Sequence, residues 1–99
     1  MTKNPRSLIH SHGGRVTLEL AGEIDGSTAA EVCYKLQELG VRDCTLDLSR
    51  VEAIDLFGAR VLARGLKGLR NHGVRFEVEP LPERVAGTLC LGGVLEALI

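Results

Sequence analysis

Two aspartates, Asp25 and Asp55, each stand where an alternating strand pattern gives way to a helical pattern. Ligands usually bind at this end of a parallel sheet, so carboxylates there could take part in catalysis. A carboxylate at the same position also stabilises the N-terminus of a helix through the helix dipole, by roughly 0.3–1 kcal/mol. Capping is the commoner use of such a residue, and we favour it over catalysis.

The remaining polar residues do not complete an active site. Further carboxylates fall in predicted loops at Glu23, Asp47 and Glu52, and no nucleophile is paired with a histidine near them. The motifs H-E-x-x-H, G-x-S-x-G, Walker A and G-x-G-x-x-G are all missing from the sequence. We therefore expect no catalytic residue and a protein that is not an enzyme.

Metal binding is also disfavoured. His10 and His12 could hold a metal from one face of a strand, but no acidic or sulfur ligand lies near them in the sequence. Cys33, Cys44 and Cys90 form no C-x-x-C pair and stand among valines and leucines, where a free cysteine behaves as a small buried hydrophobe. We expect neither a metal site nor a disulfide.

A cluster of basic residues is the most distinctive surface feature. Arg60, Arg64, Lys67 and Asn71 fall within about 60° of one another on a helical wheel, with Arg70 beside them and no acid among them. A solvated helix face usually mixes charge signs for i,i+4 pairing. The stripe is therefore either such a solvated face or a docking face for an acidic partner, and both interpretations stay open.

Composition limits the classes of function. The chain has 99 residues, 44% of them hydrophobic, and a formal net charge of −1, which is typical of one globular domain without a basic field for nucleic acid. Only Tyr34, Phe57 and Phe76 are aromatic, too few for a base-stacking platform. No apolar run is long enough to span a membrane and no signal peptide pattern is visible. We expect a small soluble domain in the cytoplasm.

The elements that would position these residues follow from hydrophobic periodicity. Alternation predicts strands over 7–10, 15–20, 44–49 and 74–79, and a three-to-four spacing predicts helices over 27–39, 55–71 and 82–91. Helices between strands require parallel, right-handed crossovers, and the turn at 12–14 adds an antiparallel edge. We therefore predict one α/β domain with a mixed β-sheet of order β-β-α-β-α-β-α over residues 7–99, after a flexible N-terminus of residues 1–6.

Three local features are predicted in more detail. Ser27 or Thr28 is expected to cap the first helix, with Glu31 at capping-box spacing from Thr28. Residues 21–26 and the segment through 51–54 are expected to be loops. Gly58 and Gly65 fall on one face of the long helix, where they would let its backbone approach the sheet closely.

Two segments together resemble the STAS domain family, which includes the anti-sigma-factor antagonists. The first resembles the family's G-E-[IL]-D-x-x-[TS]-A segment and is Gly22-Glu23-Ile24-Asp25-Gly26-Ser27-Thr28-Ala29. The second resembles its L-D-L-S-x-V-x-x-[IM]-D-S-S-G stretch and runs from Leu46-Asp47-Leu48-Ser49 through Val51 to Ile54-Asp55-Leu56-Phe57-Gly58. The resemblance covers nearly the whole chain and implies a small mixed sheet flanked by helices.

The resemblance implies a role in bacterial partner-switching. In that family an anti-anti-sigma factor binds an anti-sigma factor, often a serine kinase, which inactivates it by phosphorylating the hydroxyl residue before the motif glycine. Here that position is Phe57 and the neighbouring hydroxyl position is Leu56, so neither side chain can accept a phosphoryl group. No phosphorylation of this loop is expected.

We therefore predict a non-enzymatic interaction module that regulates transcription without the usual phospho-switch. The alternative is an accessory STAS subunit of a membrane transport complex of the phospholipid-trafficking ABC type. No cofactor is expected, although weak nucleotide binding has been suggested for some family members. The oligomeric state stays open, and so does the choice between an interface and a core position for Phe57. The predicted partner-binding residues are Asp25, Ser27, Asp55, Leu56, Phe57, Gly58, Arg60, Arg64 and Lys67.

Overall fold

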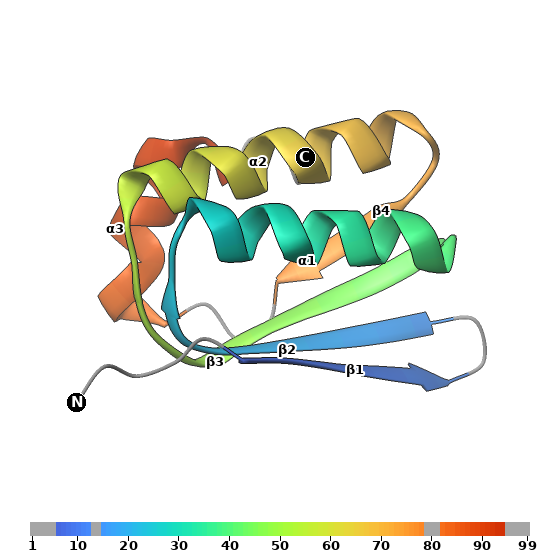
Figure 1. Cartoon of the computed structure of the whole chain (residues 1–99), viewed down its shortest axis with the longest axis horizontal. Helices are drawn as coiled ribbons and strands as arrows, with labels where there is room; N and C mark the ends of the chain where they lie inside the picture. Colours follow the sequence, from blue (N-terminus) through green and yellow to red (C-terminus); the bar gives the residue numbers. More distant parts are fainter. Residues whose placement is uncertain (1–5, 13–14, 79–81, 95–99) are drawn as a thin grey trace.

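A computed structural model of the chain describes residues 6–12, 15–78 and 82–94. Its elements follow the predicted order β-β-α-β-α-β-α (Figure 1). They are β1 (Arg6–His12), β2 (Arg15–Ile24), α1 (Gly26–Leu39), β3 (Asp43–Ile54), α2 (Leu56–Asn71), β4 (Arg75–Val78) and α3 (Glu83–Gly92). The predicted turn glycines 13–14, most of the predicted flexible N-terminus and most of the C-terminal apolar tail lie outside the described residues.

The four strands form one mixed sheet in the order β1-β2-β3-β4. β1 pairs antiparallel with β2, while the pairs β2–β3 and β3–β4 are parallel. This confirms the small α/β domain with an antiparallel edge, because only the two strands joined by a short turn run in opposite directions.

Strands β2 and β3 are longer than predicted. β2 reaches Ile24 and β3 reaches Ile54, and these two residues are paired at the end of the sheet. The prediction of loops over 21–26 and 51–54 is therefore wrong. The register between β2 and β3 shifts twice, between Glu19 and Ala21 and between Gly22 and Glu23. In β3 the alternation breaks after Leu48, where Ser49 and Arg50 are both exposed, whereas β2 keeps it to its end.

The core lies between the sheet and the helices, which cover one of its faces (Figure 1). β2 alternates strictly from Val16 to Ile24, with its buried side chains on the covered face. Two sequence predictions fail here: Leu39, assigned to the apolar stripe of α1, is 54% exposed, and Cys90 is also exposed. The most fully buried large side chains are Leu18, Leu20, Leu36, Leu46, Leu62, Leu66, Leu89, Val32, Val51, Val85 and Val94.

Close approaches between elements occur where a side chain is missing. A Cβ at Gly58 would lie 3.0 Å from the carbonyl oxygen of Ile24, so α2 begins against the end of β2, as predicted. A Cβ at Gly65 would instead collide with the Cys33 side chain of α1. Gly65 therefore brings α2 close to a helix, which corrects the prediction that it approaches the sheet.

Candidate functional site

The two junctions from strand to helix lie next to each other at one end of the sheet. The backbone N–H of Asp55 donates to the carbonyl oxygen of Ile24 at 3.3 Å, which ties the second junction to the first. Asp25 and Asp55 follow the paired ends of β2 and β3. The parallel sheet therefore brings together two aspartates that are 30 residues apart in the sequence.

Both aspartates are N-caps, which confirms the capping interpretation. Oδ1 of Asp25 accepts the N–H of Thr28 at 2.8 Å, and Oδ1 of Asp55 accepts the N–H of Gly58 at 2.5 Å. The hydrogen bond from the Thr28 N–H lowers the pKa of the Asp25 carboxyl below its usual 3.8, because it favours the charged form. The capping prediction for Ser27 or Thr28 is wrong: both lie inside the first turn of α1, after the true cap.

The first turn of α2 presents apolar side chains to solvent. Phe57 is 68% exposed and Leu56 is 40% exposed, even though three residues further on Ala59 is completely buried. The ring of Phe57 lies over Gly26, where an added Cβ would collide with it. The alternative that Phe57 turns into the core is therefore wrong. Its role as a partner contact remains a prediction.

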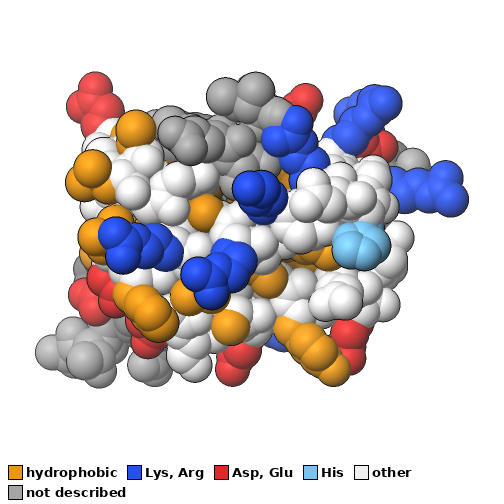
Figure 2. Space-filling model, turned by 90° about the horizontal axis from the view of Figure 1, so that it is seen from above, with side chains coloured by type: hydrophobic (Ala, Val, Ile, Leu, Met, Phe, Trp, Pro, Cys, Tyr) orange, Lys and Arg blue, Asp and Glu red, His pale blue; other side chains and the backbone are white. Residues whose placement is uncertain are grey.

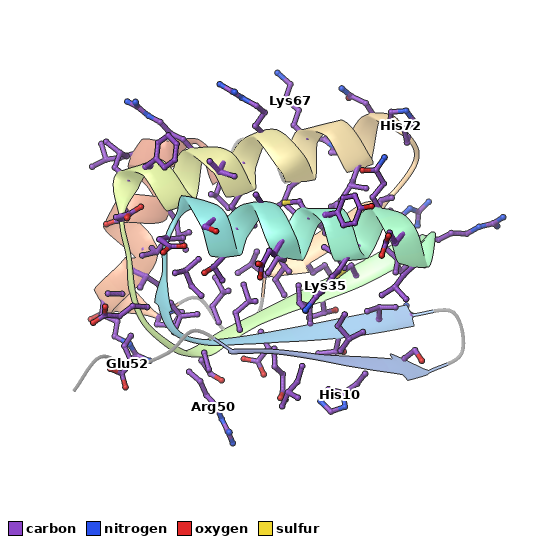
Figure 3. All side chains as sticks on the ribbon, viewed as in Figure 1. His10, Lys35, Arg50, Glu52, Lys67 and His72 are labelled. Atoms are coloured by element: carbon purple, nitrogen blue, oxygen red, sulfur yellow. The ribbon has the colours of Figure 1, made fainter. Side chains whose placement is uncertain are left out.

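Basic side chains continue this surface along α2. Arg60, Arg64 and Lys67 are all exposed, and the helix contains no acidic residue. Seen from the helix side, Lys and Arg side chains gather over the molecule with hydrophobic side chains between and beside them (Figure 2). Lys67 projects away from the sheet, whereas His10 and Arg50 project from the opposite face (Figure 3). We call Leu56, Phe57, Arg60, Arg64 and Lys67 the α2 patch.

Arg84 on α3 supports the irregular end of β3 and was not predicted. Its Nε donates to the carbonyl oxygen of Val51 and its Nη2 to that of Ser49, both at 2.7 Å. Hydrogen bonds from the side chain of Ser49 and from its backbone N–H, the latter 2.9 Å from Oδ1 of Asp47, lower the pKa of the Asp47 carboxyl because they favour its charged form. This part of β3 is thus held by one local hydrogen bond and by the two from Arg84, which span 33 and 35 residues of sequence and therefore leave no local pattern.

Within the described ranges, no three His, Cys, Asp or Glu residues are grouped so that they could hold a metal ion. His10 lies 3.5 Å from a carboxylate oxygen of Glu19, in a pair on the exposed face of the sheet. Cys33 is half-buried and Cys44 is buried, and burial raises the pKa of each thiol to about 11. None of the helices among these residues has the length and apolar character needed to cross a membrane.

Comparisons with known proteins agree on the fold. A family model described as "Mlab, STAS domain" matches residues 7–99. A solved structure of Mglu is 41% identical with a TM-score of 0.71, and the match covers 79% of this chain but 20% of that chain. The chain therefore spans about a fifth of the Mglu chain. No curated protein matches it.

Two anti-sigma factor antagonists also superpose on the chain. One, from Mycobacterium paratuberculosis, is 26% identical with a TM-score of 0.61, and the match covers 76% of this chain and 66% of that one. The other, SpoIIAA in its unphosphorylated form, is 17% identical with a TM-score of 0.61, over 78% of this chain and 76% of that one. At that identity the likeness to SpoIIAA concerns the fold alone.

Proposed function

The chain belongs to the STAS domain family, and from this premise we propose that it is a non-enzymatic interaction module of the anti-sigma-factor antagonist type. In this role it binds a protein partner in the bacterial cytoplasm, an anti-sigma factor or a kinase-type regulator, and thereby regulates transcription. The α2 patch, together with the exposed residues Asp25, Ser27 and Asp55 at the adjoining junctions, forms the contact surface. Gly58 was also predicted to contact the partner, but it is buried against the first junction and acts by letting α2 begin there.

The exposure of Phe57 is the observation that carries this proposal. The side chain of Phe57 is 68% exposed at the start of a helix. A partner that covers it removes much apolar surface from water, and the helix need not rearrange. Binding energy in protein interfaces concentrates in a few aromatic and arginine residues. Phe57 beside Arg60 and Arg64 is such a combination, with the basic residues suited to an acidic rim on the partner.

The interface is constitutive rather than switched. Phosphorylation inside an interface would add about −1.5 to −2 charge and disrupt docking, but Leu56 and Phe57 offer no hydroxyl to modify. After incubation with a kinase-type partner and ATP, intact-mass measurement should show no phosphate added between Ser49 and Gly58. A stoichiometric phosphopeptide from that segment would contradict the proposal.

The same constitutive surface favours one second candidate. An accessory STAS subunit of a phospholipid-trafficking ABC complex would stay bound to its partner, so an unswitched apolar contact suits it equally well. The partner would then be a subunit of the transport machinery. The partner's identity separates the two candidates, because one predicts a regulator of a sigma factor and the other predicts an ABC ATPase.

The test is affinity capture with the full chain, followed by mass spectrometry and by measurement of binding to the purified partner. Phe57→Ala should accelerate dissociation, typically at a cost of 2 kcal/mol or more for a buried interface aromatic. Arg64→Ala should slow association at low salt and matter little near 0.5 M salt, where the Debye length falls to roughly 4 Å.

Matched controls separate binding from folding. Leu8 on β1 is 56% exposed and lies outside both the α2 patch and the gap between α1 and α2, so Leu8→Ala removes exposed apolar surface elsewhere. It should leave capture of the same partner unchanged. If the Phe57 and Leu8 variants are both folded and bind the partner as well as the unaltered chain, the α2 patch is not the contact surface.

A further inference from the structure

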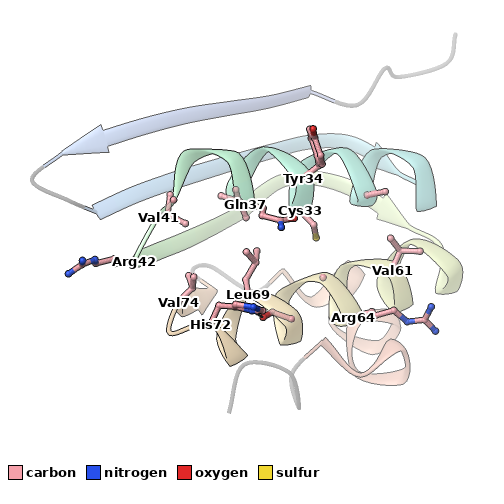
Figure 4. Close-up of a pocket in the computed structure, with 15 residues that line it drawn as sticks. Cys33, Tyr34, Gln37, Val41, Arg42, Val61, Arg64, Leu69, His72 and Val74 are labelled. Carbon is pink, nitrogen blue, oxygen red and sulfur yellow. Dashed lines mark hydrogen bonds between the residues drawn. The ribbon is translucent and has the colours of Figure 1, made fainter.

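A groove runs between α1 and α2 on the side of the molecule that faces away from the sheet. Its volume is about 750 Å³, and side chains of both helices line it (Figure 4). Its apolar lining comes from both helices and from the segments that follow them, and includes Cys33, Leu36, Val41, Val61, Leu69 and Val74. We call this depression the α1–α2 groove. The sequence did not predict it.

The charges around the groove have one sign. Two arginines, Arg42 and Arg64, line it together with His72, and no lining residue is acidic. Arg42 and Arg64 point outward from the groove in Figure 4 rather than into its floor. Cations at the rim of an apolar depression suit a partner with an apolar centre and acidic edges, because the edges of a docked segment meet the rim.

Gly68 indicates that the backbone of a partner can approach α2 closely. It lies inside α2, where glycine has a lower helix propensity than alanine. Gly65, which also lines the groove, has an internal reason to be small, because a Cβ there would collide with Cys33. At Gly68 an added Cβ would meet nothing within 4 Å. The folded chain thus leaves a helix backbone uncovered at the edge of the groove, where another backbone can approach closely.

We propose that the α1–α2 groove binds an amphipathic helix of a protein partner, with an apolar stripe on the floor and acidic side chains towards Arg42, Arg64 and His72. Helix-in-groove recognition is a common mode in which residues at i, i+3/i+4 and i+7 act as anchors. α2 has 16 residues and is therefore about 24 Å long, which matches about four turns of a partner helix. The inference rests on the proposed function, since it names the kind of partner segment that the module binds.

The groove and the α2 patch are continuous. On a helical wheel at 100° per residue, Phe57 falls on the same side of α2 as Val61, Gly65 and Gly68. Phe57 would therefore contact the partner at one end of the groove, and His72, whose Nδ1 lies 2.8 Å from the carbonyl oxygen of Gly68, would lie at the other end.

The test uses two synthetic 18-residue peptides that share one leucine stripe, one with glutamates and one with lysines flanking that stripe. Each is titrated into the full chain while backbone amide shifts are recorded by NMR. The glutamate peptide should produce saturable shifts along residues 30–42 and 61–74 with helix formation in the peptide. The lysine peptide should bind at least tenfold more weakly. Equal binding of both peptides, or shifts confined to other surfaces, would overturn the proposal.

Two glycine variants supply the decisive control. Gly68→Ala should raise the melting temperature, because the new Cβ has room and alanine favours the helix, yet it should weaken binding of the glutamate peptide at least tenfold. Gly87→Ala on α3 also has open space and lies outside the groove lining, so it should raise the melting temperature without changing binding. Unchanged affinity in Gly68→Ala would contradict close approach at this position.

A charge-reversal variant tests the role of the basic rim. Arg64→Glu should weaken binding of the glutamate peptide and strengthen binding of the lysine peptide. If decanoate produces the groove shifts while neither peptide binds, the groove takes a small carboxylate ligand and the helix proposal is wrong. If the peptides fail but a partner is still captured through Phe57, only the groove inference falls. If groove binding holds and no partner depends on Phe57, the proposed contact surface falls instead.

Discussion

At the β2–α1 junction and at the β3–α2 junction the chain repeats one local design. An isoleucine ends the strand, an aspartate caps the helix, and four residues later an alanine N–H donates to the aspartate carbonyl oxygen at 2.9 Å. The side chains between cap and alanine differ. The first junction has Gly26-Ser27-Thr28 and the second has Leu56-Phe57-Gly58.

The position of the glycine explains how the two junctions fit together. At the first junction the glycine directly follows the cap and is buried beneath the ring of Phe57. At the second the glycine comes three residues after the cap and packs against the backbone of Ile24 and Asp25. Each junction thus makes room for the other, while the second alone displays apolar surface. The capping aspartate is common to both junctions and stabilises the fold. The three residues after each cap differ, and those of the second junction make the proposed binding surface.

The largest predicted effect concerns the two glycines. Gly58→Val should destabilise the protein by about 2–3 kcal/mol, because the atoms facing it are backbone and cannot move aside. Gly26→Val should cost about 1 kcal/mol or less, because it meets the free end of the Phe57 ring, which can rotate into solvent. Urea unfolding of both variants measures the difference. Equal losses would mean that the ring of Phe57 is fixed in place.

The caps are expected to differ less. Asp55→Ala should lower the unfolding free energy by about 1–2 kcal/mol and Asp25→Ala by about 0.5–1 kcal/mol, since loss of an N-cap costs 0.5–2 kcal/mol and the Asp55 hydrogen bond is the more buried one. Thermal and urea unfolding check the order. If Asp25→Ala instead leaves stability unchanged and weakens partner binding, Asp25 acts through the interface rather than as a cap.

A smaller change is expected from the exposed ring. Phe57→Ala should shift stability by no more than about 0.5 kcal/mol, which is usual for surface positions, although partner binding falls strongly. A buried phenylalanine would cost about 3–5 kcal/mol. A stability loss in that higher range would show that the ring packs against the junction more firmly than its 68% exposure indicates.

The smallest effect is the pH dependence of the first cap. The pKa of Asp25 is lower in the folded chain than its usual value of 3.8, owing to the Thr28 N–H. Its stabilising contribution is therefore present above about pH 4 and is lost as the pH falls through the folded pKa. Asp25→Asn keeps a capping oxygen but does not titrate, so the stability of the variant relative to the unaltered chain should rise on acidification from pH 5 to pH 3. If the unfolding free energies of the variant and of the unaltered chain change in parallel between pH 5 and pH 3, this assignment is wrong.

The sequence was sufficient for the order of elements and for the helix ends that depend on single residues. Gly40 has φ 61° and ends α1 in the left-handed conformation, directly after the helix predicted over 27–39. The end of β2 was missed because two glycines and two carboxylates within 21–26 favoured a loop, although alternation of burial continues to Ile24. The end of β3 was missed because its alternation is lost after Leu48, and pairing with β2 holds it up to Ile54. At the first N-cap, Asp25 was identified correctly from its place at the junction, whereas the competing prediction of Ser27 or Thr28 was wrong because a hydroxyl with a glutamate three residues later suggested a capping box.

Surface features also differ in whether the sequence could predict them. The basic stripe could be identified from helical spacing, since Arg60, Arg64 and Lys67 belong to one helix. The α1–α2 groove could not, because it depends on how two helices separated by a strand pack against each other. The exposure of Phe57 was left open in the sequence for a similar reason: whether an aromatic residue at a helix start faces inward depends on the neighbouring junction.

The two hydrogen bonds from Arg84 have a consequence for local unfolding. They connect α3 to strand carbonyls 33 and 35 residues earlier, and hydrogen bonds from a charged donor are stronger than neutral ones. If α3 unfolded alone, the carbonyl oxygens of Ser49 and Val51 would lose their hydrogen bonds from Arg84. Because that loss is unfavourable, we expect α3 and the end of β3 to unfold together as one cooperative unit. In native-state hydrogen exchange, we therefore expect the protected amides of α3 to exchange with the same opening free energy as those near Val51.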